Sequence, residues 1–232
     1  MIEVKGLSFS YGARKVLDNI SFSSEVGEII PIIGPSGSGK STLLKLISNL
    51  SHGFSGEIRI NGFTPKSFID RATLSFMFQK TALLPHLSLF KNVTLPFQIK
   101  NEKPELERIE QMLSMYGLAE FKEHLPYQLS HGMQSRVALI RSFITKPEVL
   151  LLDEPFSALD FGIKQKIYQD FKSLTNSFRP TTLLVTHDVE EAFTLTSKKI
   201  LLLDNGKMRS FDGTVSTNKE VIKKILVDVA KF

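Results

Sequence analysis

Two kinds of apolar pattern divide the chain. Continuous apolar runs occur at 29–33, 149–152 and 182–185, and such runs are typical of strands that are buried on both faces of a parallel sheet. Helical stretches separate the last two runs, so the chain alternates between strand and helix there. The pattern therefore predicts an α/β core with a largely parallel sheet.

A second group of segments contains shorter, partly alternating apolar positions. Residues 2–9 predict an edge strand, and residues 16–17 and 20–22 predict two further short β segments. Residues 55–62 predict a strand that ends in an Asn-Gly turn, and residues 73–78 predict another strand. The N-terminal third of the chain is therefore expected to be rich in β-structure.

The middle of the chain changes character, because prolines divide residues 83–145 into short pieces. Residues 105–116 have the apolar spacing of a helix, and residues 130–145 predict a helix that Ser130 opens. This mostly helical insert separates two β-rich parts, so we expect a second lobe here. The whole chain, 1–232, is expected to form one domain, with 1–82 and 146–215 as the core and its β part, 83–145 as the helical part and 216–232 as a C-terminal helix.

The strongest local motif is Gly34-Pro-Ser-Gly-Ser-Gly-Lys-Ser-Thr42, which directly follows the first apolar run. Its spacing matches a phosphate-binding loop. Glycines allow backbone N–H groups to approach phosphate oxygens, and a helix that begins near Gly39 adds the positive end of its dipole. Lys40 is expected to reach the β- and γ-phosphates, and the Ser41 hydroxyl is expected to bind Mg²⁺. The motif therefore predicts a site for a nucleoside triphosphate.

Polar residues follow three of the predicted strands. Asp153 and Glu154 end the second apolar run, where ligands bind in α/β sheets. Asp153 can hold Mg²⁺, and Glu154 can polarise an attacking water. His187 could bond a γ-phosphate or that water, and Gln79 could bind Mg²⁺ or orient water. Taken alone, each of the last two residues is more typical of an ordinary polar strand end.

A second candidate anion site lies at Leu129-Ser-His-Gly-Met-Gln134. At a helix start, Ser130 and Gly132 would offer a hydroxyl and backbone N–H groups to an anion. An ordinary capped helix start explains the same residues. Because the phosphate-binding loop already supplies one phosphate site, a second one makes sense if it serves another copy of the protein.

Composition narrows the class of protein. The length of 232 residues is ample for one domain with a sizeable core, and the absence of cysteine excludes disulfides, a thiol nucleophile and cysteine metal sites. No apolar stretch approaches the ~20 residues of a membrane-spanning helix, and the first residues lack the blocks of a signal peptide. The net charge of +5 permits nucleic acid or an anionic membrane as a partner. Lysines and arginines are scattered among acids, however, so we favour a solvated surface with a site for a polyanionic nucleotide.

In this order, the motifs resemble those of the ATP-binding cassette (ABC) family of transporter ATPases, from about residue 2 to about residue 212. The resemblance implies a P-loop NTPase (RecA-like) core with a mixed sheet, an antiparallel β subdomain and an inserted α-helical subdomain. It implies an ATPase that uses ATP and Mg²⁺, in which two cassettes, here expected to form a homodimer, face head to tail around two ATP molecules. Transmembrane permease subunits and, indirectly, a periplasmic or extracellular substrate-binding protein would be its partners, at the cytoplasmic face of the inner or plasma membrane. Nucleic acid is not expected.

The resemblance also implies roles for individual residues. Glu154 would be the catalytic carboxylate, and Lys40, Gln79 and His187 would complete the catalytic group. Ser41, Gln79 and Asp153 would bind the metal. The residues expected to bind the nucleotide are Tyr11 on the adenine, the Walker A residues Gly34, Pro35, Ser36, Gly37, Ser38, Gly39, Lys40, Ser41 and Thr42, and, across the dimer, the signature residues Ser130 and Gly132 and the D-loop residue Asp160.

The signature motif of the family usually reads Leu-Ser-Gly-Gly-Gln. Here His131 replaces the first glycine and Met133 replaces the glutamine, whereas Ser130 and Gly132 are kept. We interpret this as a tolerated variant. A slower site, or pairing with a different cassette, remains an alternative.

Three stretches, 84–93, 153–160 and 186–192, look like those of importer cassettes and are most similar to the nitrate/sulfonate/taurine group. An importer ATPase is therefore favoured. An exporter or lipid-trafficking cassette is the alternative, followed by a soluble cassette ATPase that acts on nucleic acid. Because the resemblance ends near residue 212, no added C-terminal regulatory domain is expected.

Overall fold

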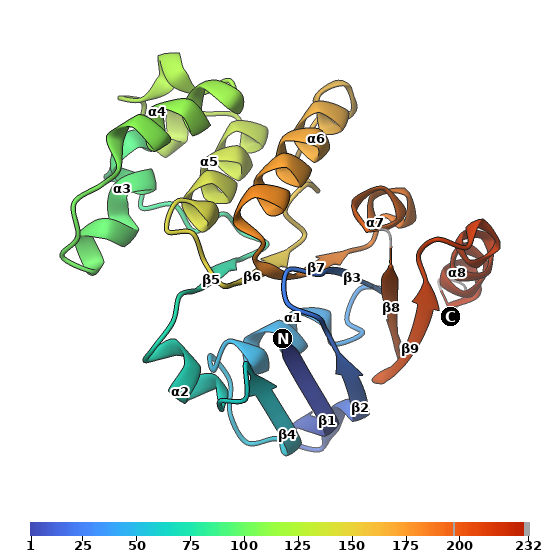
Figure 1. The fold of residues 1–232 in the computed structure, drawn as a ribbon. Helices are drawn as coiled ribbons and strands as arrows, with labels where there is room; N and C mark the ends of the chain where they lie inside the picture. The colour runs from blue at the N-terminus through green and yellow to red at the C-terminus, as the bar shows by residue number, and fades with distance from the viewer. Residues whose placement is uncertain (197, 230–232) are drawn as a thin grey trace.

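The described chain, residues 1–196 and 198–229 of a computed structural model, contains two sheets with helices around them (Figure 1). The larger sheet has the strand order β5-β6-β7-β3-β8-β9. Its strands are β3 (Ile29–Ile33), β5 (Leu74–Met77), β6 (Val149–Asp153), β7 (Thr181–Thr186), β8 (Lys199–Asp204) and β9 (Lys207–Asp212). All neighbours pair in parallel except β9, which pairs antiparallel with β8. The predicted mixed sheet is confirmed.

Every residue of β6 and β7 is buried, which explains their continuous apolar sequences. Successive side chains on a strand point to opposite faces of the sheet. Leu150 and Leu152 accordingly belong to one core, together with residues of the helices above the sheet, whereas Val149 and Leu151 belong to a second core on the other face. The buried runs thus hold two layers onto one central sheet.

The smaller sheet lies below the larger one in Figure 1 and is antiparallel, in the order β2-β1-β4. Its strands are β1 (Ile2–Tyr11), β2 (Arg14–Ser23) and β4 (Ser55–Ile60). The prediction that residues 2–9 form an edge strand is wrong, because β1 lies between the other two strands. An alternation of apolar and polar residues indicates that one face of a strand is buried, but it does not indicate how many neighbouring strands pair with it. Residues 16–17 and 20–22 belong to one strand rather than two.

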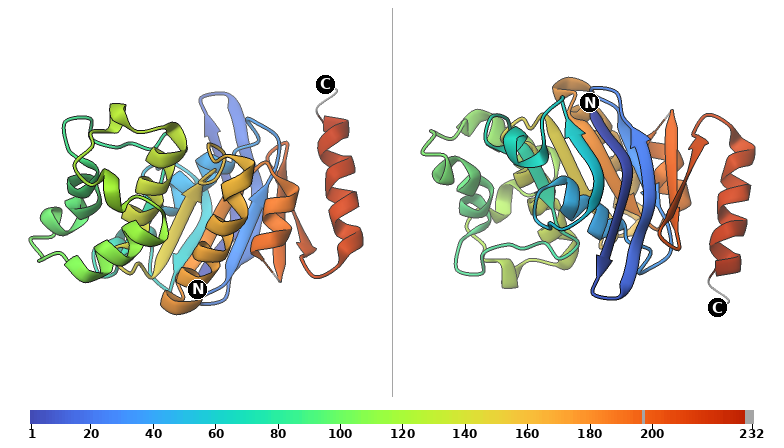
Figure 2. Two further views of the ribbon diagram at one scale, coloured as in Figure 1. Left: turned by 90° about the horizontal axis from the view of Figure 1, so that it is seen from above. Right: turned by 90° about the horizontal axis from the view of Figure 1, so that it is seen from below.

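Helix α1 (Lys40–Ile47) lies between the two sheets, and helices α3 to α6 gather on the opposite face of the larger sheet (Figures 1 and 2). The remaining helices are α2 (Pro65–Ile69), α3 (Leu89–Ile99), α4 (Leu106–Met115), η1 (Ala119–Phe121), η2 (Pro126–Gln128), α5 (His131–Phe143), α6 (Phe161–Phe178), α7 (Val189–Leu195) and α8 (Ser216–Val229). The predicted helices at 105–116 and after Ser130 are confirmed. Leu106, the first residue of α4, is exposed, whereas Ile109 and Leu113 of the same helix are buried.

Helix α8 lies beside β9, at the end of the molecule opposite the helices α3 to α5 (Figure 2). Glu190 of α7 forms ion pairs with Lys219 and Lys223 of α8, which fix α8 beside α7. The last part of the predicted C-terminal helix, residues 230–232, lies outside the described residues. No helix within 1–196 and 198–229 has both the length and the apolar character needed to cross a membrane.

Candidate functional site

The candidate site lies where three parallel strands end. β3, β6 and β7 are neighbours that run in the same direction, so their carboxyl ends lie at one edge of the sheet. The loop 34–39 follows β3, Asp153 is the last residue of β6, and His187 follows β7. Strand order thus brings together residues that are far apart in the sequence.

The loop after β3 is held closed by the first residue of α1. The Nζ of Lys40 donates to the carbonyl oxygens of Gly34 and Pro35, at 2.8 and 2.7 Å. A Cβ on Gly34 would lie 2.0 Å from the carbonyl oxygen of Leu203, and Gly39 has a φ of 105°. Both positions therefore require glycine. The loop has the shape expected of a phosphate-binding loop, with the lysine folded over it.

Two acids share the partly buried surroundings of this lysine. Burial lowers the pKa of Lys40, and the nearby Glu154 and Asp153 oppose that shift. Burial raises the pKa of Asp153, and a hydrogen bond from Ser41 is the largest opposing cause. Ser41 and Asp153 therefore offer a hydroxyl and a carboxylate side by side. These are oxygen ligands of the kind that Mg²⁺ prefers, so the residues present fit that ion.

Glu154 lies at the centre of a polar cluster. The Nε2 of Gln79 donates to its Oε2 at 3.3 Å, and the Nδ1 of His187 lies 3.3 Å from the same oxygen. Glu154 has a φ of 51°, and its backbone N–H donates to the carbonyl oxygen of Val185 at 2.9 Å. A non-glycine residue in this region is strained, and such residues cluster at functional sites. The structure brings Gln79, Glu154 and His187 together.

A cleft of about 450 Å³ opens beside this cluster. Its lining consists of Tyr11, Arg14, Val16, Ser36, Gly37, Gly39, Lys40, Ser41, Thr42, Gln79 and Glu154. Tyr11 is 53% exposed, and its ring meets Phe9 edge-on, so its free face can stack on a planar base. Arg14 and Val16 were not predicted, because they belong to no motif. Both residues come just after the turn at Gly12, and this closeness in sequence to Tyr11 is the feature from which their place in the cleft could have been predicted.

The second candidate anion site lies at the start of α5. Ser130 is the N-cap of this helix, and its Oγ accepts from the N–H of Met133 at 3.2 Å. A Cβ on Gly132 would lie 3.2 Å from the carbonyl oxygen of Ala158, so this turn lies against the loop that leads to Asp160. Ser130, Gly132 and Asp160 are not among the described residues that line the cleft. The structure therefore does not bring them to the phosphate-binding loop of the same chain.

The altered positions of this motif leave the helix start intact. The Nε2 of Gln134 donates to the carbonyl oxygens of Pro126 and Leu129, at 2.9 and 3.1 Å, and these bonds fix the segment that leads to Ser130. His131 is exposed in the first turn of α5. The change from glycine to histidine therefore adds a side chain to the surface beside Ser130.

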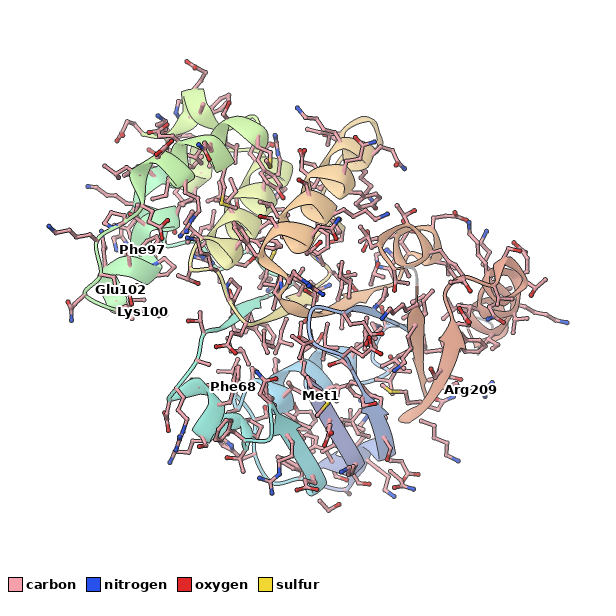
Figure 3. The ribbon with its side chains drawn as sticks, in the orientation of Figure 1. Met1, Phe68, Phe97, Lys100, Glu102 and Arg209 are labelled. Atoms are coloured by element: carbon pink, nitrogen blue, oxygen red, sulfur yellow. The ribbon has the colours of Figure 1, made fainter. Side chains whose placement is uncertain are left out.

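A groove of about 370 Å³ lies between β5 and the helices α3 and α5. Ile99 and Phe78 line it and are 73% and 39% exposed. Figure 3 labels Phe97 and Lys100 at the end of α3 that borders this groove. Exposed apolar side chains that line a groove are typical of a surface that binds a partner.

One arginine connects this groove to the site. Arg141 of α5 lines the groove and donates to the carbonyl oxygens of Thr81 and Ala82, at 3.0 and 3.1 Å. These two residues follow closely after Gln79. Burial lowers the pKa of Arg141. The segment from Gln79 to Ala82 therefore has one end at Glu154 and the other at the groove.

Comparison with known protein families places this geometry in context. The model of the family described as ABC transporter matches residues 17–157. The spermidine/putrescine import ATP-binding protein PotA of Bacteroides fragilis is 35% identical over 234 residues, which cover 98% of this chain and 50% of that protein. The probable sulfate/thiosulfate import ATP-binding protein CysA of Chlorella vulgaris is 38% identical over 211 residues, which cover 89% of each chain. The chain thus spans about half the length of the PotA relative.

Solved structures agree with these matches. The dimeric structure of MJ0796, a bacterial ABC transporter cassette, has a TM-score of 0.82 and 33% sequence identity, and the match covers 91% of this chain and 98% of that one. A structure of the same cassette in a post-hydrolysis state, bound to ADP and Pi, has a TM-score of 0.81. The two sheets and the helices described above follow the arrangement of those cassettes.

Proposed function

The chain belongs to the ABC transporter family and carries an ATPase domain of that family, and from this premise we propose that it hydrolyses ATP to ADP and phosphate to power a transporter. The observation that carries the proposal is the meeting of Gln79, Glu154 and His187 beside the cleft at the phosphate-binding loop. A nucleotide-binding loop alone would also suit a kinase or a switch. A carboxylate beside it supplies a base for water.

In the proposed complex, the backbone N–H groups of 34–39 and the Nζ of Lys40 bind the phosphates, and Tyr11 stacks on the adenine. Lys40 already donates to carbonyl oxygens at the loop, so phosphate oxygens would replace or join these acceptors. Ser41, Gln79 and Asp153 would hold Mg²⁺, whose charge offsets that of the phosphates.

Glu154 is proposed as the general base that takes the proton of the attacking water. Gln79 and His187 contact its carboxylate and would restrict its rotation. Lys40 would stabilise negative charge on the γ-phosphoryl group as its bond to the leaving ADP breaks.

Replacing Glu154 tests this function directly. In Glu154→Gln the amide cannot take the proton, so turnover is expected to fall by about 10²- to 10⁴-fold, while ATP affinity is kept. Phosphate release at saturating ATP and titration with a fluorescent ATP analogue measure the two quantities. Glu120→Gln, at an exposed acid of η1, is the control. Undiminished turnover in Glu154→Gln would contradict the assignment of the base.

We further propose that two copies of the chain face head to tail, so that Ser130 and Gly132 of one copy contact the γ-phosphate in the cleft of the other, with Asp160 at the interface. The positions of Ser130 and Gly132 outside the cleft of their own chain support this arrangement. The related MJ0796 cassette has a dimeric structure. An isologous pair would complete two identical sites.

The groove between β5 and α3 is proposed to hold a helix of a permease subunit, which would place the chain at the cytoplasmic face of a membrane. The relatives are named as import ATP-binding proteins, and the exposed Ile99 and Phe78 offer an apolar surface. A substrate-binding protein outside the membrane would then be an indirect partner. In Ile99→Asp, association with membranes that contain the permease should be lost while ATP affinity is unchanged; retained association would contradict this docking site.

For the cargo, we propose a small anion such as nitrate, a sulfonate or taurine. The stretches 84–93, 153–160 and 186–192 support this group, whereas the relatives compared above are named for spermidine/putrescine and for sulfate. Cargo contacts are expected on the permease and the binding protein, so purification of the chain from membranes with its partners is the appropriate test. If the co-purified binding protein takes spermidine but neither nitrate nor taurine, this cargo is wrong.

A further inference from the structure

Tyr168 of α6 contacts the loop that carries Glu154 and the helix α7, which begins just after His187. The residue is 4% exposed, and its hydroxyl donates to the Oε2 of Glu191 at 3.0 Å. Its ring meets the ring of Phe156 edge-on, with centroids 5.1 Å apart. Phe156 lies two residues after Glu154, and Glu191 lies four residues after His187. One side chain thus bridges the loop after β6 and the first turn of α7.

The segment around His187 is held as a unit by its own hydrogen bonds. The N–H of Asp188 donates to the Oγ1 of Thr186 at 3.0 Å, which fixes the backbone on both sides of His187. The carboxylate of Asp188 accepts from the N–H groups of Glu190 and Glu191, at 2.9 and 3.2 Å, and caps α7. These bonds connect the backbone of Glu191 to Asp188, the residue next to His187.

Asp188 and Glu191 have the spacing of a capping box, but only the bond from the Glu191 N–H to the Asp188 carboxylate is formed. Glu191 does not reach back to the start of its helix but points to Tyr168, and it is 2% exposed. Its second oxygen, Oε1, has no hydrogen-bond partner among the described residues. Burial raises the pKa of this carboxyl, and the nearby hydroxyls of Thr186 and Tyr168 oppose that shift. Burying a carboxyl lowers the stability of the fold. The presence of Glu191 here is therefore better explained by its role in positioning α7 than by a contribution to stability.

We propose that Tyr168 and Glu191 are positioning residues, which hold His187 at the carboxylate of Glu154 by fixing the loop after β6 and the start of α7 to α6. This inference rests on the proposed hydrolysis of ATP. The His187 imidazole lies 3.3 Å from Glu154 and is itself 64% exposed, so local packing does not hold it there. The Tyr168–Glu191 bond beneath it supplies the constraint. Neither residue is among the described residues that line the cleft.

Tyr168→Phe removes the hydroxyl and keeps the ring against Phe156. Loss of one buried hydrogen bond that aligns the site should lower kcat about fivefold, with KM for ATP unchanged, because the phosphate-binding loop is not altered. Tyr116→Phe is the matched control. Tyr116 is also buried, at 1% exposed, but its hydroxyl has no partner among the described residues, so kcat should stay within about twofold of the original.

Repeating the Tyr168→Phe change in a His187→Ala chain distinguishes a positioning role from a general loss of stability. If Tyr168 acts through His187, then Tyr168→Phe should have no further effect on kcat in a His187→Ala chain. The same fivefold fall in both backgrounds, or an unchanged kcat in Tyr168→Phe alone, would overturn the inference. Absence of turnover in the unaltered chain would overturn the proposed function as well, so the two failures are distinguishable.

Glu191 provides an independent variant of the same test. Glu191→Gln keeps an oxygen that accepts from Tyr168 and should keep kcat within about twofold, whereas Glu191→Leu should lower kcat at unchanged KM. Equal kcat values in the Gln and Leu variants would contradict a role for this hydrogen bond. Circular dichroism of each variant checks that the fold is retained.

Discussion

The two predicted anion sites differ in how complete they are. One lies at the edge of the sheet where β3, β6 and β7 end, and the other lies at the start of α5. At the sheet edge, Lys40 donates to carbonyl oxygens, and Gln79 and His187 contact Glu154 beside the cleft. At α5, Ser130 caps its own helix and lies outside that cleft. The first site is built from distant parts of one chain, and the second is a local turn that faces elsewhere.

This difference favours the proposal that the chain carries halves of two different sites rather than two versions of one site. A triphosphate in the cleft would meet residues of the loop 34–39, whereas Ser130 and Gly132 do not line that cleft. Gly132 lies against the loop before Asp160, so the start of α5 and this loop form one neighbouring surface. A second copy of the chain would place that surface over the cleft.

The largest expected effect is a difference in ATP affinity between variants at the phosphate-binding loop and variants at the start of α5. Lys40→Ala removes the charge that faces the phosphates and should weaken ATP binding about 100-fold. Ser130→Asp should leave binding to the single chain within about twofold, because Asp also caps helices well. Titration with a fluorescent ATP analogue at low protein concentration measures both affinities. Similar losses in both variants would show that the two regions form one site within the chain.

A mixing experiment sharpens the comparison further. Both Lys40→Ala and Ser130→Asp should be nearly inactive alone, the second because its carboxylate would repel the phosphate of the partner. In an equal mixture, half of the dimers are mixed and each mixed dimer has one intact site, so roughly a quarter of the original activity should return. A mixture that stays inactive would argue against a shared site.

A smaller effect is expected at the rim of the cleft. Tyr11→Ala removes the ring that would stack on adenine and should weaken ATP binding about tenfold, with kcat nearly unchanged. Tyr11→Phe is the control, since it keeps the ring. Comparable affinity for ATP in the Ala variant and the original chain would remove Tyr11 from the nucleotide site.

The smallest expected effect concerns pH and the buried Glu191. Burial raises the pKa of this carboxyl above its ordinary value of 4.5, so the folded chain keeps a proton that the unfolded chain loses as pH rises past that value. Between the two pKa values, stability therefore falls with rising pH. Relative to the original chain, Glu191→Gln should gain Tm as pH is raised from 5 to 8. A constant difference in Tm over this range would contradict the shift.

Local patterns predicted the fold class and the phosphate-binding loop, because both depend on residues that are close together in the sequence. The buried runs before Gly34 and Asp153 follow directly from burial on two faces of a sheet. The central position of β1 and the presence of Arg14 in the cleft depend on which distant segments come together. No local pattern reports that.

The bond between Tyr168 and Glu191 shows the same limit. In the sequence, Tyr168 is one more apolar position of a helix, and Glu191 completes a capping spacing with Asp188. Their contact depends on how α6 and α7 pack beside each other on the larger sheet, which is a property of the tertiary structure. The roles proposed for Glu154, Gln79 and His187 remain predictions, although their close contact is now observed.

The mass of the Glu154→Gln chain in solution, with and without ATP, tests the central claim most directly. If the chain carries two complementary half-sites, ATP that cannot be hydrolysed should hold two copies together, and light scattering should report about twice the monomer mass of 26.1 kDa with ATP and the monomer mass without it. The additional change Ser130→Asp should restore the monomer mass in the presence of ATP. A Glu154→Gln chain that binds ATP at saturation and still has the monomer mass would contradict the account.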